Sequence, residues 1–138
     1  MLNLIKNTQT LYGIDGYNKI IETIIQKLNA YDYYFDIKLI LTEALLNAFE
    51  HGNKSDKTKP INLFYNFDGK YLNFKITHYT KNTQNINIPE SINNEDLLKE
   101  HGRGLFLIRS LSDKVEFKDN SLFIKKNILN TTPKEVLI

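Results

Sequence analysis

The sequence predicts an α+β fold in which helices cover one face of a mixed, mostly antiparallel sheet of four or five strands. Three observations lead to this two-layer sandwich. Apolar residues recur at helical spacing as far as Gly52. They then alternate with polar residues on both sides of an Asp-Gly pair. A third helical segment and a second alternating pair follow. The expected order is helix, helix, hairpin, long loop, helix, hairpin.

Two helices are expected before Gly52. Asp15 is a suitable N-cap for the first helix, and Asp32 is a candidate cap for the second. Gly52 follows the second helix and suits a left-handed C-terminal position. The apolar positions of the first helix are Tyr17, Ile20, Ile21, Ile24, Ile25 and Leu28, and those of the second are Ile37, Ile40, Leu41, Ala44, Leu45 and Ala48.

Two hairpins are expected after a polar loop at residues 53–60. In the first, Asp68-Gly69 separates two alternating runs, which is a strong hairpin signal. In the second, Asp119-Asn120 separates two shorter runs. The alternating apolar residues are Ile61, Leu63, Tyr65, Phe67, Leu72, Phe74 and Ile76 in the first hairpin, and Val115, Phe117, Leu122 and Ile124 in the second.

A long polar connection lies between the hairpins, at residues 79–101. It contains Pro89 and a short helical pattern around residues 94–99. A connection of this length inside a compact domain is often a lid or a binding loop. From about Leu129 the chain is expected to form a tail. Between the loop and the second hairpin, a Gly-Arg-Gly triplet opens a third helix with apolar positions Leu105, Phe106, Ile108 and Leu111.

The composition predicts one globular domain spanning residues 1–138. The formal net charge is only +2, and lysines are spread along the chain without a basic block, so we expect no direct nucleic-acid partner. No apolar run approaches the roughly 18 residues of a membrane span, so no membrane partner is expected. The absence of cysteine excludes disulfides and thiolate chemistry. A cytoplasmic location is the simplest expectation.

Three polar side chains on the second helix, Glu43, Asn47 and His51, are spaced four residues apart. Each such step turns about 400°, so the three drift only about 40° per step along a stripe beside the apolar face. A carboxylate there can act as a general base toward a hydroxyl. An amide oxygen one turn later can bind Mg²⁺. For an arbitrary pair, a solvated helix face is the commoner interpretation, and a lone histidine more often caps or packs.

Two segments resemble a known family. Residues 43–52 (EALLNAFEHG) closely resemble the N-box of anti-sigma-factor serine kinases, within the GHKL superfamily of histidine kinases, gyrase and related ATPases. Residues 102–113 (GRGLFLIRSLSD) are similar to the glycine box that opens the helix beneath the ATP phosphates in that family. Glycines let backbone N–H groups approach phosphate oxygens, and a helix N-terminus favours anions. The resemblance spans about residues 15–126 and implies a GHKL-type, histidine-kinase-like ATPase fold.

The resemblance also implies roles for individual residues. Glu43 would activate a serine hydroxyl of a partner protein, and Asn47 would coordinate Mg²⁺. The γ-phosphoryl transfer itself needs mostly positioning and charge neutralisation. The implied cofactors are ATP and Mg²⁺, and the implied cofactor-binding residues are Asn47, His51, Gly52, Gly102, Arg103, Gly104 and Leu105.

The same resemblance implies regulatory partners. It predicts a serine/threonine protein kinase that phosphorylates an anti-sigma antagonist and sequesters a sigma factor. Related proteins often form homodimers, and the sequence leaves dimer formation open. The ATPase domain of a sensor histidine kinase is a less favoured alternative, since 138 residues leave no room for a phosphoacceptor helix pair.

One family feature departs from the pattern. The family has an Asp-x-Gly-x-Gly box before the lid, whose Asp recognises the adenine amino group, but here His78, Thr80 and Asn82 stand at the expected positions. An imidazole does not reproduce the acceptor geometry of a carboxylate, and losing the glycines removes a flexible turn. Two alternatives follow. Another group serves the adenine, or the chain is a degenerate, non-catalytic module that regulates a partner without ATP turnover.

Overall fold

The computed structural model describes residues 5–79 and 103–128. Within these ranges the chain forms a five-stranded sheet with the strand order β1-β2-β3-β5-β4, and every strand pair is antiparallel. The predicted α+β sandwich is confirmed. The strands are β1 (Ile5–Tyr12), β2 (Pro60–Phe67), β3 (Tyr71–His78), β4 (Lys114–Lys118) and β5 (Ser121–Asn127). The helices are α1 (Tyr17–Leu28), α2 (Tyr34–Asn47) and α3 (Arg103–Leu111).

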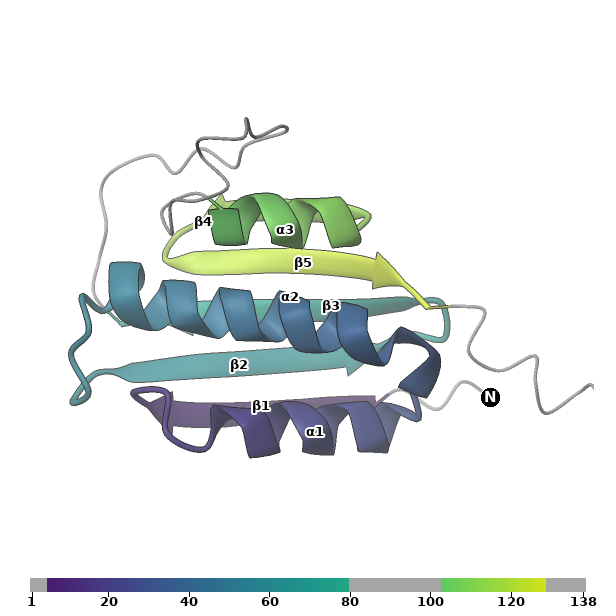
Figure 1. Ribbon diagram of the computed structural model, residues 1–138, viewed down its shortest axis with the longest axis horizontal. Coiled ribbons are helices and arrows are strands. Elements are labelled where there is room, and N and C mark those ends of the chain that lie inside the picture. Colours follow the sequence, from purple (N-terminus) through teal and green to yellow (C-terminus); the bar gives the residue numbers. More distant parts are fainter. Residues whose placement is uncertain (1–4, 80–102, 129–138) are drawn as a thin grey trace, which may run out of the picture.

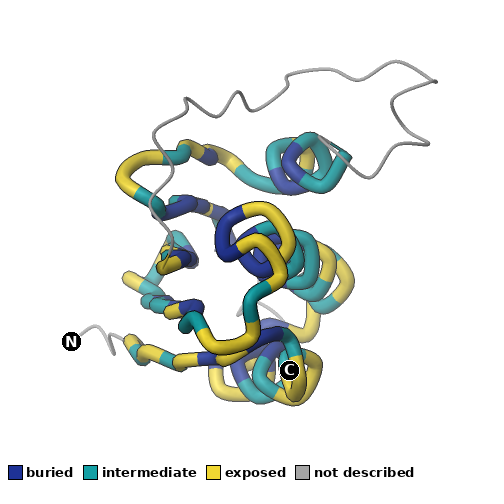
Figure 2. The backbone as a smooth tube through the Cα atoms, turned by 90° about the vertical axis from the view of Figure 1, so that its left-hand side faces the viewer, coloured by how far each residue is buried: buried dark blue, intermediate teal, exposed yellow. Residues whose placement is uncertain are grey.

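All three helices lie on one face of the sheet (Figure 1). The buried residues gather between the two layers (Figure 2). The six apolar positions predicted for the second helix are all buried, and the inward residues of β2 and β3 meet them from the sheet. Burying one large aliphatic side chain contributes about 1.5–3 kcal/mol, so this layer of side chains is the main contact that holds helices and sheet together.

The predicted helix caps are wrong. Gly16, in a left-handed conformation with φ 79°, occupies the N-cap position of α1, and no side chain caps that end. Asp15 precedes it. The second helix is preceded by the 3-10 turn η1 (Tyr31–Tyr33), so Asp32 lies inside that turn and Tyr33 stands at the N-cap position of α2.

Both predicted hairpins are confirmed. At the first turn, the Asp68 carboxylate accepts hydrogen bonds from the backbone N–H groups of Tyr71 (2.7 Å) and Lys70 (3.0 Å). These bonds hold the pKa of the Asp68 carboxyl below its usual range. At the second turn, Asp119 and Asn120 have φ values of 52° and 65°. Two consecutive left-handed residues match the right-handed twist of the flanking strands.

The first strand, β1, was not predicted. It pairs with β2 along its whole length, from Ile5 opposite Phe67 to Tyr12 opposite Pro60. Its sequence shows no apolar alternation, because Asn, Gln and Thr fill four consecutive positions of the eight and Leu11 is the residue it contributes to the core. Pairing with an apolar neighbour, rather than local propensity, makes this segment a strand.

A buried lysine joins three elements at the end of the molecule where α2 begins. The Lys126 side chain, on β5, is only 9% exposed. Its ammonium group donates a 2.6 Å hydrogen bond to the Leu111 carbonyl at the end of α3. It also lies 3.3 Å from the Asp36 carboxylate on α2 and 5.4 Å from the centre of the Tyr33 ring. This contact fixes where α3 ends against α2.

Three sequence predictions lie outside the described residues: the short helix around residues 94–99, most of the 79–101 loop, and the tail from Leu129. Among the described residues, no helix has the length and apolar character that crossing a membrane requires.

Lys125 and Lys126 provide a matched test of the buried contact. We expect Lys126→Met to lower the free energy of unfolding by about 1–2 kcal/mol, because the Leu111 carbonyl loses its hydrogen-bond donor while the aliphatic stem is kept. Lys125→Met, at an exposed position facing the other side of the sheet, should change it by only about 0.5 kcal/mol, because it loses just the exposed contact with the Tyr71 ring. Urea unfolding followed by circular dichroism measures both. Equal effects of the two substitutions would contradict the role given to Lys126.

Candidate functional site

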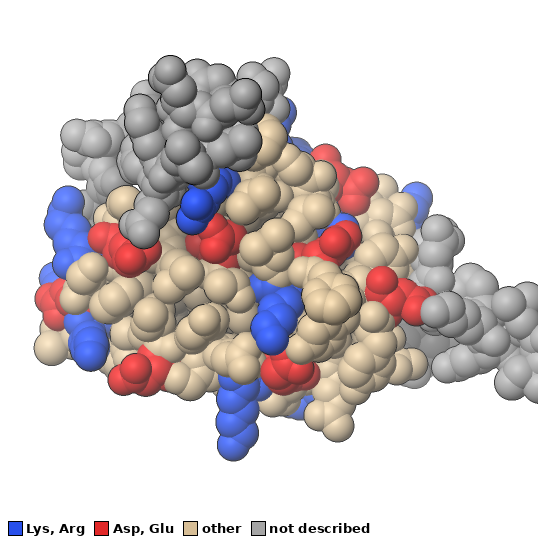
Figure 3. Space-filling model, in the orientation of Figure 1, with Lys and Arg blue, Asp and Glu red and all other residues tan. Residues whose placement is uncertain are grey.

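A cavity of about 150 Å³ opens where the end of α2 meets the start of α3. Positive and negative side chains lie side by side in this part of the surface (left of Figure 3). The cavity is lined by Glu43, Leu46, Asn47, Glu50, His51, Arg103 and Gly104. Five residues from the predicted site are therefore brought together, and they come from both segments that carry the family resemblance.

A π-helical turn, η2 (Ala48–Gly52), follows α2 directly. The backbone N–H of Asn53 donates to the Ala48 carbonyl five residues earlier, at 2.8 Å. A π turn holds more residues than an α turn, so each residue advances less around the axis, which offsets the drift of a four-residue repeat. His51 therefore lines the same cavity as Glu43 and Asn47. Turns of this kind are rare and are frequently found at functional sites.

Gly104 allows α3 to approach α2 closely. A Cβ atom placed on Gly104 would lie 3.0 Å from Oε1 of Glu43 and 3.6 Å from its Cβ. A larger residue there would shift the Glu43 carboxylate by a few tenths of an ångström. The glycine therefore keeps the carboxylate at the N-terminal end of α3, where the first backbone N–H groups of the helix have no partner within the helix.

The cavity combines hard oxygen donors with positive charge. Glu43 and Glu50 supply carboxylates, Asn47 supplies an amide oxygen and Arg103 supplies a guanidinium. Within residues 5–79 and 103–128, no group of three or more His, Asp or Glu side chains is placed to hold a metal ion. A hard cation such as Mg²⁺ accepts few protein ligands and completes its shell with water and phosphate, so this donor set fits it when a phosphate is present.

The cavity is small for a whole nucleotide. Ligand sites for molecules of drug size usually measure about 300–1,000 Å³, whereas this one measures about 150 Å³. Its size and charges suit a phosphate group with its metal ion.

Gly52 does not line the cavity. It is buried, and its φ is not in the left-handed region that the sequence predicted. The glycine is required for another reason, since a Cβ atom on Gly52 would lie 2.5 Å from Cγ of His78. Real Cβ atoms do not approach so closely. The end of η2 can therefore pack directly on the imidazole at the end of β3.

His78, the residue at the expected adenine-reading position, is buried to 5% exposure. Its ring stacks on Phe117 of β4, with centroids 5.8 Å apart and planes 18° apart. One side of the imidazole thus faces Phe117, and the Gly52 backbone packs against the same side chain. His78 is therefore packed in the core, at the position that the sequence analysis aligned with the adenine-recognising Asp of the family.

Asn53 does not line the cavity but is a buried structural residue, although the sequence placed it in a polar loop. It is 1% exposed and connects three backbone segments. Its side-chain amide donates to the carbonyls of Lys59 (3.3 Å) and Pro60 (3.1 Å), and its oxygen accepts from the N–H of Tyr79 at 2.8 Å. The available signal was an asparagine directly after a helix end. The sequence does not show that this asparagine is buried, because the residues around it are those of a polar loop.

The remaining predicted residues have different environments. Leu105 is buried at 8% exposure and packs in the core under α3. Gly102 lies outside the described residues. Leu46 and Glu50 line the cavity but were not predicted. Their spacing from Glu43, three and seven residues, places them on the same helix face and could have indicated them.

Comparison with known proteins supports the family. Residues 20–128 match the family model described as the histidine kinase-like ATPase domain. The chain belongs to this family. A comparison with curated protein sequences finds no match. Membership in the histidine kinase-like ATPase family agrees with the antiparallel sheet, the helices on one face and a phosphate-sized cavity between α2 and α3.

The contact between Gly52 and His78 can be tested by a double-mutant cycle. Gly52→Ala should lower the free energy of unfolding by about 1–3 kcal/mol, because the added methyl group overlaps the imidazole. His78→Ala removes the ring atoms that would lie 2.5 and 2.6 Å from the new methyl group but keeps the His78 Cβ at 2.8 Å. The double variant should therefore recover part of the strain, about 0.5–1 kcal/mol relative to the sum of the single effects. Thermal and urea unfolding measure the four proteins. Additive effects would show that the two residues are not in the close contact described.

Proposed function

We propose that this histidine kinase-like ATPase domain is an ATP- and Mg²⁺-dependent serine/threonine protein kinase of the anti-sigma-factor type. The observation that carries the proposal is the cavity in which Glu43, Asn47 and Arg103 meet at the N-terminal end of α3. A general base, an oxygen ligand for a hard cation and a phosphate-binding cation are the protein groups that phosphoryl transfer to a hydroxyl needs.

Each residue of the cavity has a proposed task. The Asn47 amide oxygen would hold Mg²⁺, and Mg²⁺-ATP, when bound, would supply the phosphoryl group and neutralise charge. The Glu43 carboxylate accepts the proton of the attacking hydroxyl. Arg103 binds phosphate oxygens through its planar guanidinium. His51 lies at the rim, where it contacts the same ligand.

The proposed partners follow from the resemblance of residues 43–52 and 102–113 to anti-sigma-factor kinases. The hydroxyl substrate is a serine of an anti-sigma antagonist protein. The second partner is a sigma factor, which the protein sequesters, and the working form is a homodimer.

Nucleotide binding is the first test of the proposal. Isothermal titration calorimetry with ATP and Mg²⁺ should give a measurable affinity for the wild-type protein. Asn47→Ala should weaken the affinity by about tenfold or more, because it removes a metal ligand worth at least about 1.4 kcal/mol. Thr42→Ala, a neighbouring change on α2 outside the cavity, serves as the control. Absence of binding at millimolar ATP with Mg²⁺ rules the kinase out.

Phosphoryl transfer is the second test. With radiolabelled ATP and an antagonist protein, Glu43→Gln should lower the rate by about 10²–10⁴-fold while nucleotide affinity stays close to that of the wild type. Gly104→Ala should leave the fold intact but lower the rate by about 10–100-fold, since the new methyl group displaces the Glu43 carboxylate. If Glu43→Gln transfers phosphate at the wild-type rate, Glu43 is not the base.

A second candidate function is a non-catalytic module that regulates a partner protein without ATP turnover. The burial of His78 against Gly52 and Phe117 favours it, because the ring is packed where the family places an adenine-reading carboxylate. The two functions are separated by the same assays. A catalytic protein transfers phosphate in a Glu43-dependent manner, whereas the module binds its partner equally well with and without nucleotide.

A further inference from the structure

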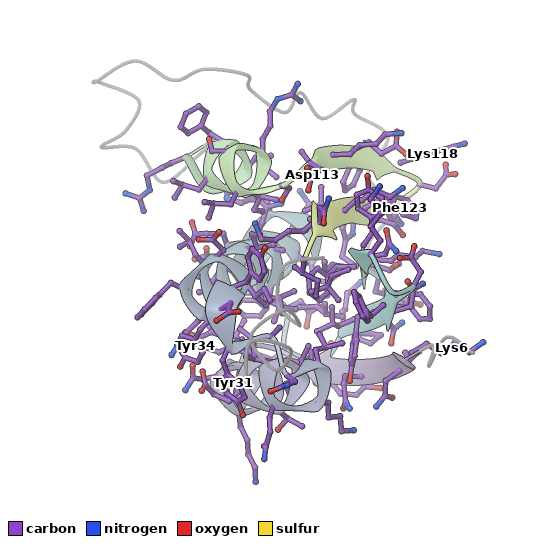
Figure 4. The ribbon with its side chains drawn as sticks, turned by 90° about the vertical axis from the view of Figure 1, so that its right-hand side faces the viewer. Lys6, Tyr31, Tyr34, Asp113, Lys118 and Phe123 are labelled. Atoms are coloured by element: carbon purple, nitrogen blue, oxygen red, sulfur yellow. The ribbon has the colours of Figure 1, made fainter. Side chains whose placement is uncertain are left out.

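The face of the sheet that points away from the helices carries a row in which aromatic and charged side chains alternate. The register places Thr8, Phe64, Lys75, Phe123 and Glu116 side by side across all five strands. Neighbouring side chains across a sheet are about 5 Å apart, so the two phenylalanines lie about 10 Å apart with Lys75 between them. The labelled Phe123 lies on this outer side of the sheet (Figure 4).

Lysines surround this row on the same face. Lys6, Lys125 and Lys114 belong to the next row along the strands, and Lys118 lies in the row on the other side. All of these lysines and Lys75 are exposed. Glu116 lies among them, and the Asp68 carboxylate at the adjoining turn interacts electrostatically with Lys125. Figure 4 shows Lys6 and Lys118 at opposite edges of the open face.

The charge of this face contrasts with the rest of the protein. The whole chain has a formal net charge of only +2, and five lysines against two carboxylates, Glu116 and Asp68, already exceed that value. The remaining surface therefore carries a net negative charge, and on the helix-covered face the two signs are interspersed (Figure 3). Lysines that are scattered along the sequence are gathered on one face because neighbouring strands come from distant segments.

The rings on this face are accessible and are associated with lysines. Phe64 and Phe123 are half-buried, and the ammonium group of Lys75 lies 5.5 Å from the centre of the Phe123 ring. In the same way, the ammonium group of Lys125 lies 4.6 Å from the centre of the Tyr71 ring. Such exposed contacts are worth only about 0.5–1 kcal/mol, so the lysines can turn from the rings to a bound anion at small cost.

These features favour one class of ligand. A second copy of this chain on the same face would bring two sets of lysines together, which is unfavourable. The core of a protein–protein interface is usually depleted in lysine and more apolar than this face. Nucleic-acid interfaces are polar and strongly positive, and single strands combine a basic surface with aromatic rings on which bases stack.

We propose that the open face of the sheet binds single-stranded nucleic acid. This reverses the expectation drawn from the scattered lysines of the sequence, because the fold gathers five of them on one face. Bases stack on Phe64 and Phe123, while Lys75, Lys125 and Lys114 contact the phosphates. Asn62, Thr77 and Thr8 line a hollow beside Phe64 together with Lys75. The Asn62 oxygen accepts from the Thr10 hydroxyl and the Thr77 hydroxyl is bonded to Ser121, so the side-chain NH₂ of Asn62 is the donor we assign to base edges. The inference is independent of the kinase proposal, because this face lies on the opposite side of the sheet from the cavity.

Fluorescence anisotropy with a labelled single-stranded oligouridine of about 12 nucleotides tests the inference, since sites of about 4–16 nucleotides are usual for sequence-tolerant binding. The wild-type protein should bind at about 100 mM salt. The double variant Lys75→Glu, Lys125→Glu should weaken binding by at least about tenfold. It should also reduce the slope of log K against log salt concentration by the amount that about one to two phosphate contacts contribute.

A matched control changes the charge equally on the helix side. Lys19 and Lys27 are exposed on α1, and the double variant Lys19→Glu, Lys27→Glu should bind within about twofold of the wild type. Equal losses in the two double variants would show non-specific attraction and overturn the proposal. Absence of binding by the wild-type protein would overturn it as well.

Removal of the aromatic rings distinguishes a nucleic-acid ligand, whose bases stack on them, from an acidic protein partner. Phe123→Leu and Phe64→Leu should each weaken binding by about fivefold or more, because a leucine offers no flat ring to a base. Thermal unfolding identifies which of the two variants keeps its fold. If neither folded variant loses affinity, or if polyglutamate displaces the oligonucleotide at equal charge concentration, the face recognises acidic protein and the proposal is wrong.

Discussion

The close packing of Gly52 on the His78 ring determines where the second helix ends over the sheet. Because the glycine has no side chain, the π turn reaches the end of β3 and rests on the imidazole, which is supported from another side by Phe117. The buried Asn53 then ties the same point to the start of β2 and to Tyr79. The cavity residues on α2 and η2 are positioned by this junction, although His78 itself does not line the cavity.

Most of the fold follows from hydrophobic periodicity, and the exceptions have clear physical causes. The apolar stripes of α1 and α2 and the alternation of β2 and β3 appear directly in the sequence, and the Asp-Gly and Asp-Asn turns mark both hairpins. The first strand carries no such pattern, because it lies at the edge of the sheet and contributes little beyond Leu11 to the core. The caps at Asp15 and Asp32 failed because Gly16 and a 3-10 turn begin these helices instead.

The candidate site was partly predictable for the same reason. The four-residue spacing of Glu43 and Asn47 is sufficient to place them on one helix face. The position of His51 depends on a π turn, which a regular helical repeat does not anticipate. The role of Gly52 could not be derived from local conformation at all, because it depends on contact with His78, a residue 26 positions later in the chain. Tertiary contacts of this kind leave no periodic signal.

The buried Lys126 has a mechanical consequence for the cavity. It holds the last residue of α3, whereas Arg103 and Gly104 stand at the first turn of that helix. A nine-residue helix is about 13 Å long, so a rotation of α3 about Leu111 moves its first turn the most. A swing of only about 5° moves its free end by about 1 Å, enough to widen the space beside the Glu43 carboxylate. A tilt of α3 about Leu111 would therefore change the space beside Glu43 while leaving the Lys126 contact in place.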